Sequence, residues 1–255
     1  MTKYIVTGII LGGLIILAIE YWPEEPQKEI KEIPPVVTEP EKEAVVVPVV
    51  EEINATEVEP EVVFELPPYD ESDAWLDAEV GEQMAGLPKQ DRIARGVAFL
   101  ASASQGSLNK KNWPSISKFP VLKEGDEYWL DPAGFSRFDT WVQRIASYSA
   151  EEMAELVFKI RPWADEALRQ IGDRRTFDDL VRDFCRQIES APVIPARIQL
   201  VQPNVLYQFK DVNLEQLSDL HKQFLRMGPD HTIRLQAHAD TFVRAYDLLI
   251  LEQGD

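Results

Sequence analysis

The stretch TFDDLVRDFCRQI, residues 176–188, has the pattern of a capped amphipathic helix. Thr176 stands where a side-chain oxygen can accept a hydrogen bond from the first backbone N–H groups of a helix. Asp178 and Asp179 follow near the positive end of the helix dipole. Apolar side chains then recur every three or four residues, which places them on one face. These side chains are Phe177, Leu180, Val181, Phe184 and Ile188. The stretch therefore predicts a helix that buries one face in a core.

Similar helical patterns lie on both sides of this stretch. Residues 149–152 form a capping-box pattern that opens a helix, Pro162 is expected to break or kink that helix, and residues 164–171 continue as helix to Gly172. Three more helical segments are predicted: a capped start at Asp70 to Asp73 followed by Trp75, Leu76 and Val80, the run Ile93, Val97 and Leu100, and the amphipathic stretch Asn213 to Met227. Gly228 is placed to end the last of these helices, and Pro229 to begin the next helix.

Two stretches have the alternation and turn residues of β-hairpins. Residues 120–130 contain short apolar strands on either side of a polar turn at 123–127, and residues 197–209 alternate around Pro203-Asn204. The length from residue 67 to residue 255 suits one domain. We therefore expect a mainly α domain of the α+β class, mostly helical with one or two β-hairpins.

The chain begins with an apolar run that predicts a single transmembrane helix over residues 4–22. Residues 4–19 carry no charge, and an interfacial Tyr-Trp pair closes the run. At roughly 1.5 Å per residue this helix would span about 28 Å, which suits a hydrocarbon core of about 30 Å. Bulky residues stand where signal cleavage needs small ones, so an uncleaved anchor is favoured over a cleaved signal or a buried helix. Lys3 precedes the run and glutamates follow it, which predicts a cytoplasmic tail at 1–3 and an exported C-terminal part.

An acidic, proline-rich linker is predicted over residues 23–66. Counted from residue 20, this part holds 14 glutamates, three lysines, seven prolines and no glycine, which gives a net charge of −11. Such a composition buries too little apolar surface to offset its ordering entropy, so we expect disorder and an extended chain. Residues 44–50 either pair with a sheet edge of a partner or serve as an apolar spacer. Gly8 and Gly12 form a G-x-x-x-G that either pairs membrane helices or is apolar filler.

Six stretches between residues 66 and 240 match a known pattern in order and spacing. They are LPPYDESDAWL at 66–76, GFSRFDTWV at 134–142, LVFKIRPWADEALRQIG at 156–172, FDDLVRDFCRQI at 177–188, SAPVIPARIQLVQPNVLYQFKD at 190–211 and HKQFLRMGPDH at 221–231. Together they resemble a proteobacterial family known only as domain of unknown function 3014. The strings at 202–209 and 226–229 echo its more specific marks.

The resemblance implies a membrane helix and a variable Pro/Glu-rich linker ahead of the domain. It implies no activity and supplies no catalytic residues. One departure is visible, because the chain reads Leu100-Ala101-Ser102-Ala103 where the family pattern has Val-Asp-Asn-Leu. An activity that used this Asp-Asn pair would be lost here, whereas a turn or cap position would tolerate the change.

Three histidines and one cysteine are the first candidates for metal or nucleophilic chemistry. On one helix His231 and His238 would lie two turns, about 10 Å, apart, which is too far for one metal ion. Together with His221 they are expected to be surface or capping residues, and no metal or cofactor is predicted. Cys185 falls among core positions without a base beside it, which favours a buried structural thiol.

Acidic residues are the candidates for hydrolysis. A hydrolase would use carboxylates between residues 126 and 139, of which Asp131 and Asp139 are one pair. Asp178 and Asp179 are a second pair, but their place beside a helix cap explains them without chemistry.

Three further clusters are expected to be surface features. Serines in a glycine-containing stretch lack the G-x-S-x-G pattern and indicate a flexible loop. Two basic-aromatic clusters suit anionic lipid or glycan, although plain solvated surface is favoured. A net charge of −8 over residues 67–255 disfavours nucleic acid as a partner. The residues are Ser102, Ser104 and Ser107 around Gly106, Lys110 and Lys111 with Trp113, and Arg174 and Arg175 with Phe177.

These patterns favour a non-enzymatic protein anchored in a bacterial inner membrane through residues 4–22, with its domain in the periplasm. A long tether raises the effective concentration of a domain without fixing its geometry, which suits binding or scaffolding. The expected partner is an envelope protein or a cell-wall component. The alternative is a periplasmic hydrolase that uses the carboxylates near residues 126–139.

Overall fold

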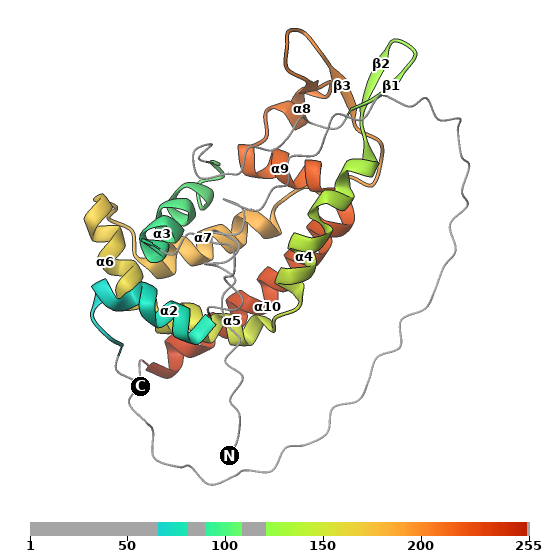
Figure 1. Cartoon of the computed structure of the whole chain (residues 1–255). Coiled ribbons are helices and arrows are strands. Elements are labelled where there is room, and N and C mark those ends of the chain that lie inside the picture. The colour runs from blue at the N-terminus through green and yellow to red at the C-terminus, as the bar shows by residue number, and fades with distance from the viewer. Residues whose placement is uncertain (1–65, 81–89, 109–120, 254–255) are drawn as a thin grey trace, which may run out of the picture.

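The computed structural model describes residues 66–80, 90–108 and 121–253 as a mostly helical domain with one small β-sheet (Figure 1). In chain order the helices are η1 Tyr69–Glu71, α2 Ser72–Val80, α3 Arg92–Ala103, η2 Pro132–Phe138, α4 Asp139–Ala146, α5 Ala150–Lys159, α6 Arg161–Ile171, α7 Phe177–Glu189, α8 Val212–Glu215, α9 Asp219–Met227 and α10 Pro229–Gln253. The strands are β1 Val121–Glu124, β2 Glu127–Leu130, β3 Gln199–Val201 and β4 Gln208–Phe209.

Helix α7 confirms the prediction for residues 176–188. The Thr176 side chain accepts a hydrogen bond from the backbone N–H of Asp179, and the Asp179 carboxylate accepts one in return from the Thr176 N–H. This reciprocal capping box fixes the first turn. The apolar face that begins at Phe177 and ends at Ile188 is buried in the main core.

The predicted break at Pro162 is also confirmed. Helix α5 ends at Lys159, and α6 begins two residues later with Pro162 in its first turn, where the missing N–H costs no hydrogen bond. Gly172 then ends α6 with a φ of +74°, a conformation that glycine adopts without steric cost.

The stretch from Asn213 to Met227 forms two helices and not one. The side chain of Asp211 accepts a hydrogen bond from the Asn213 N–H and opens α8. Ser218 has an extended backbone, and its hydroxyl accepts a hydrogen bond from the His221 N–H, so a new helix begins there. Local capping at Ser218 therefore overrides the continuous apolar spacing.

Helices α2 and α3 are joined by a cap that comes from a distant residue. Asp91 precedes α3 with a φ of +56° and makes no side-chain capping bond. The carboxylate of Asp73 in α2 accepts hydrogen bonds from the backbone N–H groups of Asp91 and Arg92 instead, at 2.7 and 3.1 Å. The buried guanidinium of Arg92 also binds Asp77 in α2 at 2.8 Å. These bonds fix α2 against α3.

Both predicted hairpins form, and they join into one antiparallel sheet in the order β1-β2-β3-β4. The first hairpin pairs Val121 with Leu130 and Glu124 with Glu127. The second is shorter than predicted, because only Leu200 with Phe209 and Val201 with Gln208 are paired. The link between the hairpins, β2 to β3, was not predicted.

Two hydrophobic cores stabilise the domain. The main core lies between the helices, and the 25-residue helix α10 runs along it in contact with α4, α5, α7 and α9. The second core lies under the sheet and consists of Leu130, Ile198, Leu200, Phe209 and Leu225. In Figure 1 the sheet accordingly projects at one end of the helical body.

Within the described ranges no helix is both long enough and apolar enough to cross a membrane. The predicted transmembrane helix at 4–22 and the predicted linker at 23–66 lie outside those ranges, apart from Leu66.

Candidate binding surface

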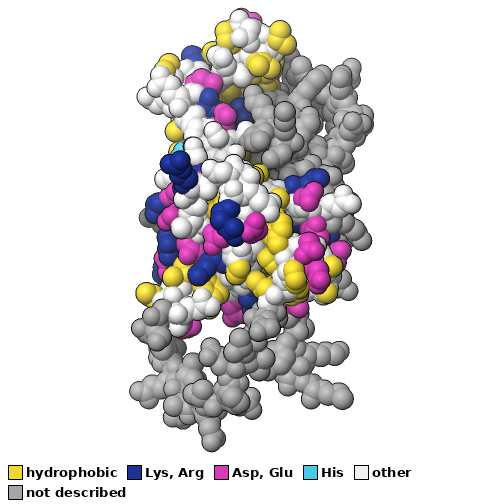
Figure 2. Space-filling view, turned by 90° about the vertical axis from the view of Figure 1, so that its left-hand side faces the viewer, with side chains coloured by type: hydrophobic (Ala, Val, Ile, Leu, Met, Phe, Trp, Pro, Cys, Tyr) yellow, Lys and Arg dark blue, Asp and Glu magenta, His cyan; other side chains and the backbone are white. Residues whose placement is uncertain are grey.

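The connection between β3 and β4 exposes two aliphatic side chains at the sheet end of the molecule. Val205 is 88% exposed and Leu206 is 71% exposed, and Val212 at the start of α8 is also exposed. Figure 2 shows hydrophobic side chains at this upper end of the domain. Such exposure is uncommon for adjacent large apolar residues and marks a candidate contact surface.

Local hydrogen bonds hold this connection in one shape. The Asn204 side chain accepts a hydrogen bond from the Leu206 N–H at 2.8 Å, which is an Asx turn. The Gln202 amide donates to the Val205 carbonyl at 3.4 Å. The two aliphatic side chains are therefore presented by a defined turn, and we call residues 202–207 the apolar tip.

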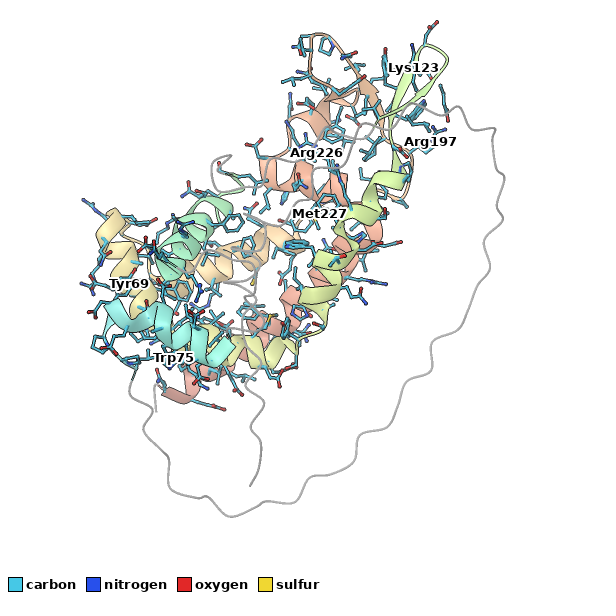
Figure 3. All side chains as sticks on the ribbon, in the orientation of Figure 1. Tyr69, Trp75, Lys123, Arg197, Arg226 and Met227 are labelled. Carbon is cyan, nitrogen blue, oxygen red and sulfur yellow. The ribbon has the colours of Figure 1, made fainter. Side chains whose placement is uncertain are left out.

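Aromatic and cationic side chains lie on the neighbouring strands, and Tyr128 joins them to the apolar tip. The rings of Tyr128 and Tyr207 meet edge to face with centroids 5.3 Å apart. Lys123 lies over the Tyr128 ring, and the Arg197 guanidinium lies 4.5 Å from the centroid of the Trp129 ring (Figure 3). Tyrosine, tryptophan and arginine are the side chains most enriched at protein interfaces.

The base of the apolar tip is tied to α8 and α9. The carboxylate of Glu215 accepts a hydrogen bond from the Phe209 N–H at 2.9 Å and pairs with Lys222 at 3.0 Å. Phe209 itself is buried in the second core. The tip is thus mounted on a packed base.

The carboxylates considered for hydrolysis lie at three separate places: a helix cap, a contact with a histidine and a hairpin turn. Asp131 is the N-cap of η2 and accepts a hydrogen bond from the Ala133 N–H at 2.9 Å. Oδ1 of Asp139 lies 2.9 Å from Nε2 of His231, so the structure joins two candidates that the sequence placed 92 residues apart. Asp126 lies in the turn between β1 and β2.

The other two histidines lie at separate places. Nε2 of His221 lies 2.9 Å from the Gln187 carbonyl, so the ring helps to hold α9 against α7. Burial lowers the pKa of His238, and the negative charge of Glu151 opposes this shift in part. Among the described residues no three His, Cys, Asp or Glu side chains lie close enough together to hold a metal ion.

Cys185 is buried in the main core, as predicted. Burial raises the pKa of its thiol to about 12, and the negative charges of Glu189 and Asp247 add to this shift. The side chain is therefore a neutral thiol at neutral pH and a poor nucleophile.

The serine and arginine clusters have structural roles that the sequence did not predict. Ser102 and Ser104 lie at the end of α3 and not in a flexible loop. Arg175, which forms an ion pair with Asp173 at 2.6 Å, donates to the Ala101 carbonyl and the Ser104 hydroxyl at 3.1 and 3.0 Å. It thus caps the carboxyl end of α3. Phe177 is buried, and the cluster at 110–113 lies outside the described residues.

Asp178 accepts a hydrogen bond from a buried phenol. Tyr246 in α10 is fully buried, and its hydroxyl donates to Oδ1 of Asp178 at 2.7 Å. Burial raises the pKa of Tyr246, and the bond to Asp178 raises it further. Arg161 lies 3.6 Å from the other carboxylate oxygen. The carboxylate therefore joins α10 and α6 to the start of α7.

Tyr246→Phe is expected to lower the free energy of unfolding by about 2 kcal/mol, because it removes a buried hydrogen bond to a charged acceptor. Urea denaturation followed by circular dichroism measures the loss. Tyr128→Phe at the half-exposed sheet is the control and should change the stability by less than about 0.5 kcal/mol. Equal losses in the two variants would contradict the structural role of the hydroxyl.

A model of the family described as Protein of unknown function (DUF3014) matches residues 92–242. The chain belongs to this family. The DUF3014 match runs from the start of α3 into α10, so it includes the sheet and the apolar tip. The expected membership of domain of unknown function 3014 is confirmed over these residues. No curated protein and no solved structure matches the chain.

The apolar tip was not predicted, because the alternating pattern of residues 205–209 indicated a continuous strand. The strand prediction over 205–209 would have paired Val205 and Leu206 within a sheet, whereas β4 begins only at Gln208. The Pro203-Asn204 pair was the available signal, since an Asx turn at Asn204 delays the return of the chain to the sheet.

Proposed function

We propose that this DUF3014 protein is a non-enzymatic binding module held at a bacterial inner membrane. The apolar run at 4–22 supports the anchor, and the acidic composition of 23–66 supports an extended tether. In this proposal the tail at 1–3 is cytoplasmic, and the domain at 67–255 works in the periplasm.

The exposure of Val205 and Leu206 carries the binding proposal. Burying these two side chains against a partner would remove most of their apolar surface from water. Such burial favours association by about 25 cal/mol per Å², and the loss of translational, rotational and side-chain freedom on binding opposes it. Tyr207, the next residue in the chain, and Tyr128, whose ring it meets, suit the centre of a protein interface. Glu124 pairs with Arg197 at 2.8 Å, and Asp126 and Glu127 offset Lys123, so the hairpin carries no excess of positive charge to attract an anionic lipid surface. We therefore propose an envelope protein as the partner.

The alternative is a periplasmic hydrolase with carboxylates from residues 126–139. No observation among the described residues favours it, since Asp131 caps η2 and Asp139 lies against His231. A hydrolase, unlike a binding module, should lose its cellular phenotype in Asp131→Asn or Asp139→Asn while the domain stays folded.

Photo-crosslinking of the full chain in intact cells tests the binding proposal. A crosslinking residue at position 206 is expected to capture one protein, whereas the same residue at Leu248, which is 59% exposed on α10, is not. Leu206→Asp should abolish the interaction by placing a charge in an apolar interface, and Leu248→Asp should leave it intact. Equal crosslinking from both positions, or capture of glycan in place of protein, would contradict the proposed partner.

A further inference from the structure

A pocket of about 510 Å³ lies where the segment that precedes α2 meets α6, and we call it the α6 pocket. Leu66, Pro67 and Tyr69 form one wall, and Pro162 and Trp163 in the first turn of α6 form the other. Figure 3 shows Tyr69 between α2 and α6, away from the sheet. Pockets of roughly 300–1,000 Å³ are the size that binds small molecules, so the α6 pocket is large enough for a ligand.

A hydrogen bond and a ring contact fix the two walls of the α6 pocket against each other. The indole N–H of Trp163 donates to the Pro67 carbonyl at 3.0 Å, which joins α6 to the segment before α2. The Trp163 ring also meets the Trp75 ring of α2 edge to face, with centroids 5.2 Å apart. Because the walls are already in place, a ligand that enters the pocket loses little free energy to ordering of the protein.

Planar polar side chains line the α6 side of the pocket. Arg169 and Gln170 lie three and four residues after Glu166, so the three side chains share one face of the helix. The Glu166 carboxylate pairs with Arg169 and accepts a hydrogen bond from the Gln170 amide at 3.1 Å. The Arg169 side chain is 71% exposed. A guanidinium has five N–H donors and an amide has two, so both groups retain donors for a ligand.

The charges around the α6 pocket favour a neutral ligand. The positive charge of Arg169 is offset by Glu166, and Asp70 adds a negative charge on the opposite wall, so a phosphate or carboxylate group would be repelled. Burial raises the pKa of Tyr69, and the negative charges of nearby carboxylates, that of Asp91 first, raise it further, so the phenol stays neutral. A cationic ligand gains little, because both oxygens of Glu166 already have donors. Hydroxyl groups donate and accept without a charge and suit this mixture.

We propose that the α6 pocket binds sugar units of a neutral glycan, with the Tyr69 ring as the stacking surface and Arg169 and Gln170 as hydrogen-bond donors to the hydroxyl groups. A pyranose ring has a face of C–H groups that packs on an aromatic ring and a rim of hydroxyl groups that donate and accept. The pocket places an aromatic wall beside planar polar groups, which matches both features. It is open to solvent, so the rest of a glycan chain can extend out of it. This site is separate from the apolar tip and does not depend on the proposed function.

Isothermal titration calorimetry of the full chain, in a detergent without a sugar headgroup, tests the site. The probes are cello-, malto- and N-acetylchito-oligosaccharides, and at least one of them is expected to bind with a Kd of about 1 mM or below. Arg169→Ala and Gln170→Ala, both at exposed positions, should each weaken that affinity about threefold to tenfold. Tyr69→Leu should abolish binding, whereas Tyr69→Phe, which keeps the ring, should retain it.

Arg186→Ala is the matched control, because it removes an exposed arginine from an ion pair of the same spacing on α7, and it should leave glycan binding unchanged. Leu206→Asp in the apolar tip should also leave it unchanged, so failure of this site is distinguishable from failure of the proposed protein interface. Circular dichroism shows whether Tyr69→Leu stays folded, and the two exposed α6 variants carry the test if it does not. Absence of binding to all three oligosaccharides, binding that survives Arg169→Ala and Gln170→Ala undiminished, or equal loss in Arg186→Ala would overturn the proposal.

Discussion

Gly228→Ala is expected to lower the free energy of unfolding by about 3–5 kcal/mol. Gly228 has a φ of +92° and a ψ of 162°, a combination essentially confined to glycine. A Cβ atom at this position would also lie 2.5 Å from Cδ2 of Phe135, whose ring is part of η2. The strain and the overlap fall at the junction of α9 and α10, so the substitution must move either the ring or the long helix. Urea denaturation of the full chain measures the loss.

Gly172→Ala is the matched control for this effect. Gly172 also has a positive φ, +74°, but nothing lies within 4 Å of a Cβ there, so only the backbone strain of about 1–2 kcal/mol is expected. Phe135→Ala combined with Gly228→Ala should recover part of the additional loss, since it removes the overlapping ring. Equal losses at the two glycines would show that the contact with Phe135 is not what requires glycine at 228.

The sequence could predict the elements whose ends are set by neighbouring residues. The capping box at Thr176, the interruption at Pro162 and the boundary between Gly228 and Pro229 all lie where local chemistry placed them. The first hairpin follows the same rule, because its turn contains Gly125 with a φ of +59°. In each case the deciding contacts lie within about four residues along the chain.

Contacts between distant residues could not be predicted in this way. The two hairpins join through the pairing of Tyr128 with Leu200, and no local pattern specifies which strand edges meet. Asp73 caps α3 across 18 residues, and Arg175 caps the other end of the same helix from the connection between α6 and α7, 74 residues beyond Ala101. Such side chains looked like ordinary surface charges because their partners are set by the packing of helices.

The candidate sites, like the fold, depend partly on local contacts and partly on contacts between distant residues. His231 and Asp139 were each assessed alone, yet the packing of α10 against α4 brings them together. The exposure of Val205 and Leu206 depends on an Asx turn that ends the strand pattern early. The two family marks at 202–209 and 226–229 were visible in the sequence, but only the fold shows that Phe209, in the first mark, and Leu225, just before the second, pack in one core.

The stability of the domain is expected to fall by about 3 kcal/mol between pH 9 and pH 12 through the Cys185 thiol alone. Burial raises the pKa of this thiol from 9.0 to about 12, so the folded state holds the proton more tightly than the unfolded state does. A group whose pKa is raised on folding contributes its full stabilisation below the unfolded pKa. That stabilisation is lost as the pH rises through the folded pKa.

Cys185→Ala isolates this contribution, because Tyr246 also has a raised pKa and adds to the alkaline loss in both proteins. At pH 8 the variant should be less stable than the parent by about 1 kcal/mol, since the smaller side chain leaves a small cavity in the main core. As the pH rises above 9 the parent loses stability faster, so the order of the two proteins should reverse before pH 12. Chemical denaturation under reducing conditions at a series of pH values follows the difference, and parallel curves from pH 8 to pH 12 would mean that the thiolate is not excluded from the core.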